Sequence, residues 1–197
     1  RRQRQMCIRD SYKTIEELVA AAKEKGNLKA STNGNKASNH TAAQLLAKSA
    51  GFKYKAIPYG GTADQLLALR QGEVDFTCAK VADVAKLVKG DKPELRVLAV
   101  FNTKRDPELP NVPTLGEKGL YPEWYGSARA LVAPKGTKPE VIQYYVEAFK
   151  KTMQDPAVIE AHKKAGMALD FKDNKELGDL IKAQDKFARD VVNDLYK

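Results

Sequence analysis

Two short loops carry residues whose types and spacing suit the binding of a small anion. Residues 31–40 read STNGNKASNH and combine hydroxyl and amide side chains with one glycine and one lysine. Residues 58–62 read PYGGT and place two glycines, which expose backbone N–H groups, ahead of a predicted helix. Helix N-termini carry free N–H groups and a partial positive charge, which favour carboxylates. The candidate ligand-binding residues are Asn33, Gly34, Asn35, Ser38, Asn39, His40, Tyr59, Gly60, Gly61 and Thr62.

Each loop also has a plainer interpretation. Ser38 could cap a helix at the end of a solvent loop, and the glycines of the second loop could form an ordinary turn. Both loops follow predicted strands, however, and ligands of open α/β sheets bind at the carboxyl ends of strands. Together the loops therefore favour a site for a small polar anion.

The sequence contains no recognisable pattern for catalysis, metal binding or cofactor binding. His40 and His162 fall in different predicted segments, and the chain has no CxxC, HExxH, GxSxG or Walker pattern. Cys78 follows a predicted strand, where a lone thiol packed in a core is commoner than a nucleophile. We therefore expect no enzyme, no metal site and no cofactor.

Composition narrows the class of partner. The 197 residues are 43% hydrophobic and 30% charged, which fits a soluble globular protein of one or two domains. No apolar run approaches the roughly 18 residues that span a bilayer. The formal net charge is +9, but basic and acidic residues alternate along the predicted helices, so no nucleic-acid partner is expected.

The first eleven residues, RRQRQMCIRDS, have no helix, strand or turn pattern. Codons of a transposase-tagmentation sequencing adaptor, read in frame, would encode this string, so we interpret residues 1–11 as non-native. Removing its four arginines and one aspartate lowers the net charge from +9 to +6, and removing Cys7 leaves Cys78 without a disulfide partner. On this interpretation the native start and any signal peptide are missing.

The elements that must position the loops alternate between helix and strand from Tyr12 onward, which predicts a mainly parallel sheet with helices on both faces. Helices are expected at residues 15–25, where Thr14 and Glu17 form a capping box before Gly26, and at residues 41–50, 62–71 and 81–89. Thr62 is the expected cap of the third helix, with Gln65 in the capping-box position. Strands are expected at residues 28–31, 54–58, 74–78 and 95–101.

The pattern changes after residue 119. A strand-like run at residues 124–133 can cross between sheets, so we expect a domain boundary near Ser127. A helix capped by Thr137, a second helix starting at Asp155-Pro156, a strand at residues 167–171 and a terminal helix at residues 175–197 should follow.

The segment LRVLAVFNTKRDPELPNVPTLGEKG, residues 95–119, joins these two parts. It reads as a buried strand, a basic turn, prolines spaced by three and a short helix capped by Thr114 with Glu117. It resembles the signature of the solute receptors of tripartite tricarboxylate transporters. Further family-like motifs occur in order, and they are the loop ending in His40, PYGG at 58–61, GEVD at 72–75, and WYG at 124–126 with APKGT at 133–137.

The resemblance implies a periplasmic-binding-protein type II-like fold of two doubly wound α/β domains, the first of them incomplete here. Residues 12–126 would form most of domain 2, and residues 127–197 the returning part of domain 1. Such receptors bind small di- or tricarboxylates and deliver them to a membrane permease, as monomers in the periplasm or on a lipid anchor. Because half of the site would be absent, we expect no tight ligand binding by this chain.

The resemblance also leaves alternatives open at single residues. Where relatives often carry an acidic residue, the chain has Cys78-Ala79-Lys80, so Lys80 either binds an anionic ligand or simply begins the next helix. The first loop is one residue longer than in relatives, which leaves the roles of Gly34, Asn35 and Ser38 uncertain by one position. Ser127, at the expected boundary, completes the candidate set.

A second function class shares the clamshell architecture. The effector domain of a transcriptional regulator would have a similar fold and would carry a DNA-binding helix pair at its N-terminus. The signature at residues 95–119 counts against this alternative. The full open reading frame would decide between a signal peptide and a DNA-binding region.

Overall fold

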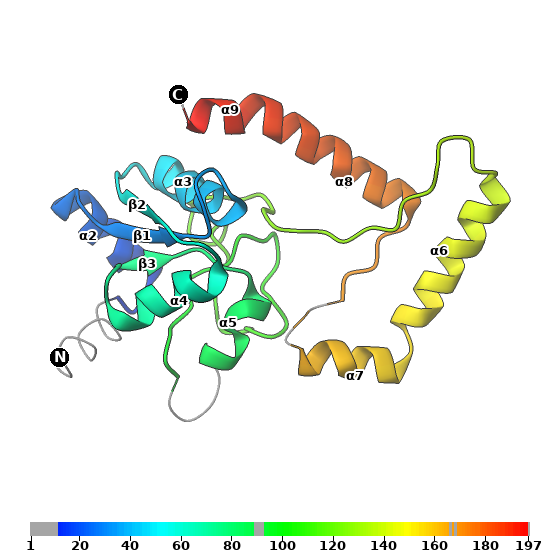
Figure 1. Ribbon diagram of the computed structural model, residues 1–197, viewed down its shortest axis with the longest axis horizontal. Coiled ribbons are helices and arrows are strands. Elements are labelled where there is room, and N and C mark those ends of the chain that lie inside the picture. The colour runs from blue at the N-terminus through cyan, green and yellow to red at the C-terminus, as the bar shows by residue number, and fades with distance from the viewer. Residues whose placement is uncertain (1–11, 89–92, 166, 168, 197) are drawn as a thin grey trace. The chain divides into compact units, whose positions relative to one another are not determined.

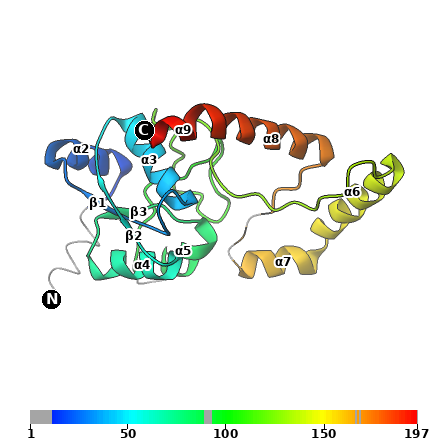
Figure 2. The same ribbon diagram turned by 45° about the horizontal axis from the view of Figure 1, so that its top comes forward.

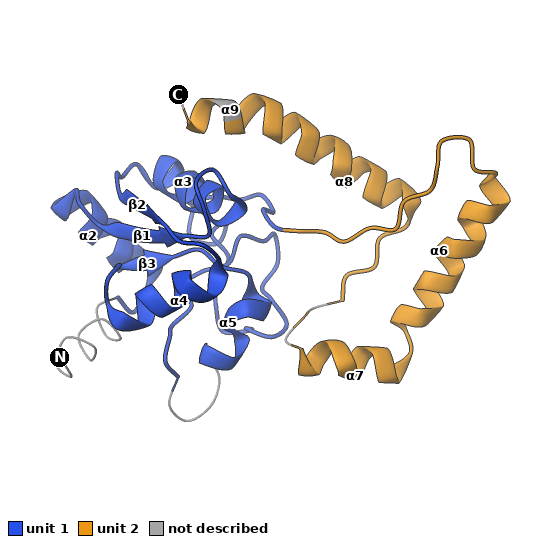
Figure 3. Cartoon of the chain, viewed as in Figure 1, with its two compact units in different colours: residues 1–126 blue, residues 127–197 orange. Residues whose placement is uncertain are grey.

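The chain divides into two compact units, unit 1 (Arg1–Gly126) and unit 2 (Ser127–Lys197), which are described separately (Figure 3). The computed structural model describes residues 12–88, 93–165, 167 and 169–196. The segment that we interpret as non-native, residues 1–11, lies outside them. The assignment of the two units to receptor domains stays a prediction.

A three-stranded parallel sheet organises unit 1 (Figure 1). The central strand β1 (Lys29–Thr32) pairs with β2 (Lys55–Pro58) on one side and with β3 (Phe76–Thr77) on the other. Ala30 lies opposite Ala56 of β2 and Phe76 of β3. The first three predicted strands are thus present, although β3 covers only two of the five residues expected.

Helices cover both faces of this sheet, as the alternating pattern predicts. They are α2 (Ile15–Lys25), α3 (Ser38–Ala50), α4 (Thr62–Gln71) and α5 (Val81–Val88). In both views α2 and α3 lie on one face and α4 on the other (Figures 1 and 2). The expected capping box of α2 is confirmed, since Thr14 Oγ1 accepts from the Glu17 N–H and Gly26 ends the helix at φ 64°. The helix α3 begins three residues earlier than predicted.

The core of unit 1 lies between β1 and the helices α2 and α3. Its buried members are Ile15, Leu18, Ala22, Leu28, Ala30, Ala43, Leu46, Ala47, Ala50, Phe52, Phe76 and Leu115. Phe52, Tyr54 and Phe76 add edge-to-face ring contacts, with centroids 5.6 Å apart for Tyr54 and Phe76. The sequential βα units therefore share one apolar layer, which fixes the strand ends in space.

The segment at residues 93–126 lacks the strand predicted at 95–101. Only a single parallel bridge forms, between Val100 and Thr114, in which Val100 donates to the Pro113 carbonyl and Leu115 donates to the Val100 carbonyl, both at 3.0 Å. The preceding rung, toward the start of the predicted strand, would need the N–H of residue 113 to donate to the carbonyl of Leu98. Residue 113 is a proline and has no N–H. The ladder therefore stops after one bridge.

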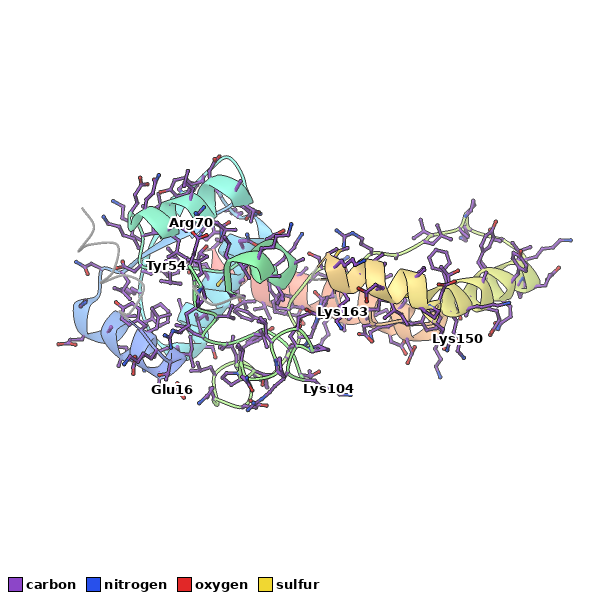
Figure 4. All side chains as sticks on the ribbon, turned by 90° about the horizontal axis from the view of Figure 1, so that it is seen from below. Glu16, Tyr54, Arg70, Lys104, Lys150 and Lys163 are labelled. Atoms are coloured by element: carbon purple, nitrogen blue, oxygen red, sulfur yellow. The ribbon has the colours of Figure 1, made fainter. Side chains whose placement is uncertain are left out.

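The short helix predicted after Thr114 is a series of turns, although its capping interactions do form. Glu117 N–H donates to Thr114 Oγ1 at 3.0 Å, and Thr114 N–H donates to Glu117 Oε2 at 3.3 Å. Arg105 of the basic turn makes an ion pair with Glu117. Glu16 of α2 pairs with Lys118 at 2.7 Å on the surface, and Figure 4 labels Glu16 on the outside of unit 1. Exposed pairs of this kind contribute little stability.

The regular structure described for unit 2 is helical. It contains α6 (Pro139–Met153), α7 (Pro156–Lys164), α8 (Asn174–Phe187), the π-helical segment η1 (Ala188–Val192) and α9 (Asn193–Leu195). The start signals act as predicted at α7, where Asp155 caps the helix. Lys138, rather than Thr137, is the N-cap of α6, and an Asp173–Glu176 capping box opens α8. The terminal helix is thus confirmed in position but interrupted by η1.

The described residues form neither of the two strands predicted for the second part of the chain. The described residues in the ranges 124–133 and 167–171 are irregular, and many are exposed. A strand needs a backbone partner, and no described segment of unit 2 provides one. Among the described residues of α6, α7, α8 and η1, none is buried, so the apolar sides of these helices are uncovered within unit 2.

Candidate ligand-binding site

The parallel sheet of unit 1 brings three loops to one edge. The carboxyl ends of β1, β2 and β3 point the same way, so residues 33–37, 59–61 and 78–80 lie side by side ahead of α3, α4 and α5. The two loops singled out from the sequence are therefore neighbours, because β1 and β2 are paired strands. Tyr59 N–H continues this pairing by donating to the Thr32 carbonyl at 2.9 Å.

The first loop turns sharply between β1 and α3. Gly34 has φ 128°, which suits glycine, and its carbonyl accepts from Thr32 Oγ1 at 3.2 Å. Lys36 has φ 58° and is the one described non-glycine residue in the left-handed region. Its N–H donates to His40 Nδ1 at 2.9 Å, which supports this backbone conformation.

His40 is buried in the first turn of α3 and serves as an acceptor. Because Nδ1 accepts the Lys36 N–H, the neutral ring carries its proton on Nε2. Burial lowers the pKa of His40 below its ordinary value, since desolvation disfavours the charged form. His40 therefore holds the loop as a neutral imidazole and supplies no positive charge to an anion.

The N-terminus of α3 lacks a cap from its own N-cap residue. That residue is Ala37, which has no side-chain acceptor, and Ser38 is the first helical residue rather than the cap. The plainer interpretation of Ser38 as an N-cap is thus wrong. Asn33 Oδ1 accepts the Asn39 N–H at 3.3 Å, and Ser38 itself is exposed.

The N-terminus of α4 is likewise uncapped. Gly61 is the N-cap, in extended conformation, and Thr62 is the first helical residue, so the prediction that Thr62 caps this helix is wrong by one position. The first N–H groups of a helix have no partner inside the helix. They remain open to an acceptor beside Gly60 and Gly61. Asp64 also lies here, with Oδ2 3.5 Å from the point that a Cβ on Gly60 would occupy, and its charge opposes an anion.

Three further candidates, Tyr59, Lys80 and Ser127, are less well placed to bind an anion. Tyr59 donates its hydroxyl to Glu73 Oε2 at 3.1 Å, and burial together with Glu73 raises the Tyr59 pKa. Lys80 is exposed directly before α5, and its carbonyl accepts from the Asp83 N–H at 3.0 Å. Ser127 is exposed and belongs to unit 2, so the structure does not place it with the others.

Cys78 directly follows β3 and begins the third loop. Desolvation of its sulfur raises the pKa to about 12, so almost no thiolate exists near neutral pH. A nucleophilic role would need the opposite shift. Among the residues that the structure describes, no group of three or more His, Cys, Asp or Glu side chains is arranged to hold a metal ion.

Sequence reasoning missed Gln65, which lies in the first turn of α4 with none of its surface exposed. Its side chain bonds to Asn39 of α3 and to Thr77 and Cys78 at the end of β3. The sequence signal was a glutamine next to Leu66 on the apolar side of the helix, which we interpreted only as a capping-box position.

The end of unit 1 also reaches this region. Tyr125 donates its hydroxyl to the Ser38 carbonyl at 3.2 Å and its N–H to the Phe101 carbonyl at 3.3 Å. The ring of Trp124 lies so close to Gly126 that an added Cβ would meet Cζ2 at 2.9 Å. Glycine is therefore required here by space rather than by φ.

A family model described as "Tripartite tricarboxylate transporter family receptor" matches residues 7–195. The chain belongs to this receptor family. The recognition made from the five motifs is therefore confirmed. No helix in the described part of the chain has the length and apolar content needed to cross a membrane.

Several curated relatives match part of their length. The UPF0065 protein of the gbd 5' region of Cupriavidus necator is 37% identical over 145 residues, covering 73% of this chain and 43% of the relative. Protein BugT of Bordetella pertussis is 29% identical over 150 residues, covering 75% of this chain and 45% of BugT. The chain thus spans about half the length of the curated relatives it matches.

Solved structures confirm the predicted fold class as a partial periplasmic-binding-protein fold. A TctC solute-binding protein from Polaromonas has TM-score 0.84 and 26% identity, covering 95% of this chain and 64% of that protein. Rpa4515 of R. palustris, solved with adipate, has TM-score 0.73 at 22% identity, covering 90% of this chain and 60% of that protein. MatC from Rhodopseudomonas palustris, with bound malate, has TM-score 0.56 at 20% identity, covering 78% and 52%.

Proposed function

We propose that the whole protein is an extracytoplasmic solute receptor that binds small organic di- or tricarboxylates and delivers them to the permease of a tripartite tricarboxylate transporter. It would act as a monomer in the periplasm or on a lipid anchor, without a cofactor and without catalysis. Membership of the receptor family favours this function over the effector domain of a transcriptional regulator.

The observation that carries the proposal is that two helix N-termini at one sheet edge, those of α3 and α4, have no side-chain cap from their own N-cap residue. Three other helices have a side-chain cap, namely Thr14 at α2, Asp155 at α7 and Asp173 at α8, whereas α6, with Lys138 as its N-cap, has none. At α3 and α4 the N-caps are Ala37 and Gly61, which offer no side-chain acceptor. A carboxylate placed there would accept these N–H groups and meet the positive ends of two helix dipoles.

Charge around the loops sets how strongly this half of the site attracts an anion. Lys36 and Lys80 are exposed cations at the same edge, and Asp64 is an exposed anion between them in chain order. Each exposed charge acts weakly because water and salt screen it. Two neighbours in fold were solved with adipate and with malate, which supports a small dicarboxylate as the ligand class.

The binding claim is tested on the 197-residue chain by NMR titration with succinate, malate or citrate at constant ionic strength. We expect backbone amide shifts confined to residues 34–40 and 60–63, with affinity weaker than micromolar because a second wall is needed for tight binding. The neutral diester of succinate should leave these amides unchanged. Shifts spread evenly over exposed lysines of unit 2, or no shifts at all, would contradict the proposal.

A variant with a new N-cap at α3 should affect stability and ligand binding in opposite directions. Ala37→Asp places a carboxylate at the N-cap of α3, where φ −73° and ψ 170° suit a capping residue. We expect it to stabilise unit 1 by less than about 1 kcal/mol, because Asn33 already accepts the Asn39 N–H. It should abolish the succinate shifts at residues 38–40, because the new carboxylate repels an anion and competes for the same helix end. Urea unfolding and NMR measure the two effects.

The control for this variant is Lys138→Asp. It adds a carboxylate at the N-cap of α6, a helix outside the proposed site, and should leave the succinate shifts unchanged. If Ala37→Asp binds succinate like the wild type, the N-terminus of α3 is not part of the site.

The delivery step requires the complete gene. Sequencing the locus from unfragmented source DNA, deleting it and measuring carboxylate uptake by the cells tests the link to a permease. Loss of uptake that the restored gene repairs is the expected result. Unchanged uptake of every carboxylate that shifts the NMR spectrum would remove the transport role while leaving the binding result intact.

A further inference from the structure

Gln65 places a primary amide in the interior of unit 1, directly beneath the proposed site. The residue is fully buried in the first turn of α4. A buried amide costs free energy unless its donors and acceptor are satisfied, so its partners define what it does.

The hydrogen bonds of Gln65 connect α4 with three other elements at this edge of the sheet, namely α3, β1 and β3. Gln65 Oε1 accepts from Asn39 Nδ2 of α3 at 2.9 Å. Gln65 Nε2 donates to the Cys78 carbonyl at 2.7 Å and also to Thr77 Oγ1, both at the end of β3. The Gln65 backbone carbonyl accepts from Ser31 Oγ of β1 at 3.0 Å.

This network admits one orientation of the amide. Turning the group over would set its NH2 against the NH2 of Asn39 and its oxygen against the Cys78 carbonyl. Thr77 is fixed as well, because its hydroxyl accepts from Gln65 and donates to the Ser31 carbonyl at 2.9 Å. The amide therefore defines both the spacing and the rotation of α3 relative to α4.

We propose that Gln65 is the positioning residue of the receptor site, holding the N-termini of α3 and α4 so that both address one ligand carboxylate. It does not touch the ligand itself. The link runs through Asn39, whose N–H is held by Asn33 of the first loop. This inference rests on the proposed function, since positioning matters only if the two helix ends share a ligand.

The decisive variant is Gln65→Glu, which keeps the shape of the side chain and makes the network titratable. In its protonated form the introduced carboxyl group can still accept from Asn39 and donate to Cys78 or Thr77. In its ionised form the carboxylate faces the Cys78 carbonyl, which cannot donate, and the Thr77 hydroxyl can donate to it only by giving up its bond to the Ser31 carbonyl. Burial raises the pKa of such a carboxyl. For this variant we expect succinate to shift the amide signals of residues 34–40 and 60–63 near pH 6.5. Its affinity for succinate should fall about tenfold or more by pH 8.5. The affinity of the wild type should stay the same over this pH range.

The matched control is Gln71→Glu, which adds the same charge at an exposed position of the same helix. It should bind succinate like the wild type at every pH. Thr77→Val, which removes one acceptor of the network without adding charge, should weaken binding at all pH values. Thr77→Val serves as the test variant if the Gln65→Glu chain fails to fold.

Two measurements keep this inference separate from the proposed function. Without ligand, titration of the Gln65→Glu chain should move amide signals of both helix N-termini with one common midpoint. If only α4 signals move, Gln65 does not position both helices. If a folded Gln65→Glu or Thr77→Val chain binds succinate as strongly as the wild type at every pH, the positioning role is also wrong. If the wild type shows no succinate shifts but both helix ends titrate together, the coupling stands and the ligand assignment fails.

Discussion

Single residues of the first loop divide into those that face solvent and those that hold the backbone. Asn35 and Ser38 are exposed, whereas the side chains of Asn39 and His40 are buried and hydrogen bonded within unit 1. In the sequence all four are polar residues with no visible difference. Their burial differs because the backbone turns at Gly34 and Lys36. In our proposal the buried pair positions the loop and the backbone N–H groups bind.

The acceptor role of His40 makes unit 1 sensitive to acid. Its folded-state pKa lies below the ordinary value of 6.5, so the unfolded chain takes up the proton first as pH falls. The stability that neutral His40 contributes is therefore complete above about pH 6.5 and is lost as pH falls toward the lowered pKa. Urea unfolding of the wild type between pH 7.5 and 5.5 should show this loss.

His40→Gln supplies the comparison, because glutamine keeps an acceptor for the Lys36 N–H but does not titrate. We expect the stability of this variant to depend less on pH than that of the wild type. Parallel acid losses in the two proteins would show that other groups cause the effect.

The carboxylate of Asp64 should weaken anion binding at α4. It lies against Gly60 beside the open N–H groups, so Asp64→Asn removes a like charge from the site. We expect about two- to fivefold tighter succinate binding by NMR titration, a range set by charge effects at exposed helix ends. Asp83→Asn, in the first turn of α5, is the comparison at the neighbouring helix. Equal or weaker binding by Asp64→Asn would place the ligand elsewhere.

At the scale of elements, the position of a cap decides which helix end is closed and which is open. Thr14 caps α2 through the Glu17 N–H, whereas Thr62 lies one residue inside α4. The two threonines stand in similar sequence contexts, each three residues before Glu17 or Gln65. The difference is that Thr14 itself has the extended backbone of an N-cap, whereas at α4 Gly61 has it and Thr62 is already helical.

The same substitution at the two threonines tests this difference. Thr14→Ala should lower the free energy of unfolding by about 1 kcal/mol, because an N–H group loses its acceptor. Thr62→Ala should change it by less than about 0.5 kcal/mol, since no cap is lost. Urea denaturation of both variants under one condition gives the comparison. Equal losses would restore Thr62 as the cap.

The elements that could be predicted from the sequence are those specified locally. Caps and glycines fix α2, α7 and the start of α8 without reference to the rest of the chain. The run at residues 95–101 reads as a strand by composition, but Pro113 on the facing segment removes the donor that a ladder needs. Gln65 was missed for the same reason, because its partners come from distant elements.

At the scale of the whole molecule, burial is concentrated in unit 1. Its core joins residues of α2, α3 and the sheet, whereas in unit 2 Val132 and Tyr144 are 82% and 70% exposed. Apolar burial is the main favourable term in folding. The chain also spans about half the length of the curated relatives it matches. No described residue of α6, α7 or α8 is buried.

Hydrogen exchange should reveal this difference between the units. We expect amides of α2, α3 and β1 to be protected to near the global stability, and those of α6 and α7 to exchange by local opening at much lower free energy. Mass spectrometry of peptides from the intact chain measures both sets in one experiment. Protection of α6 equal to that of α3 would show that its apolar side is covered.

The packing of Trp124 on Gly126 gives the protein an optical reporter of its own. The chain contains one tryptophan, so all indole fluorescence comes from a ring seated on the last residue of unit 1. The next residue along, Tyr125, is tied to the first turn of α3. The emission colour and intensity of Trp124 thus follow events at the sheet edge and at the unit boundary together, with no dye or isotope required.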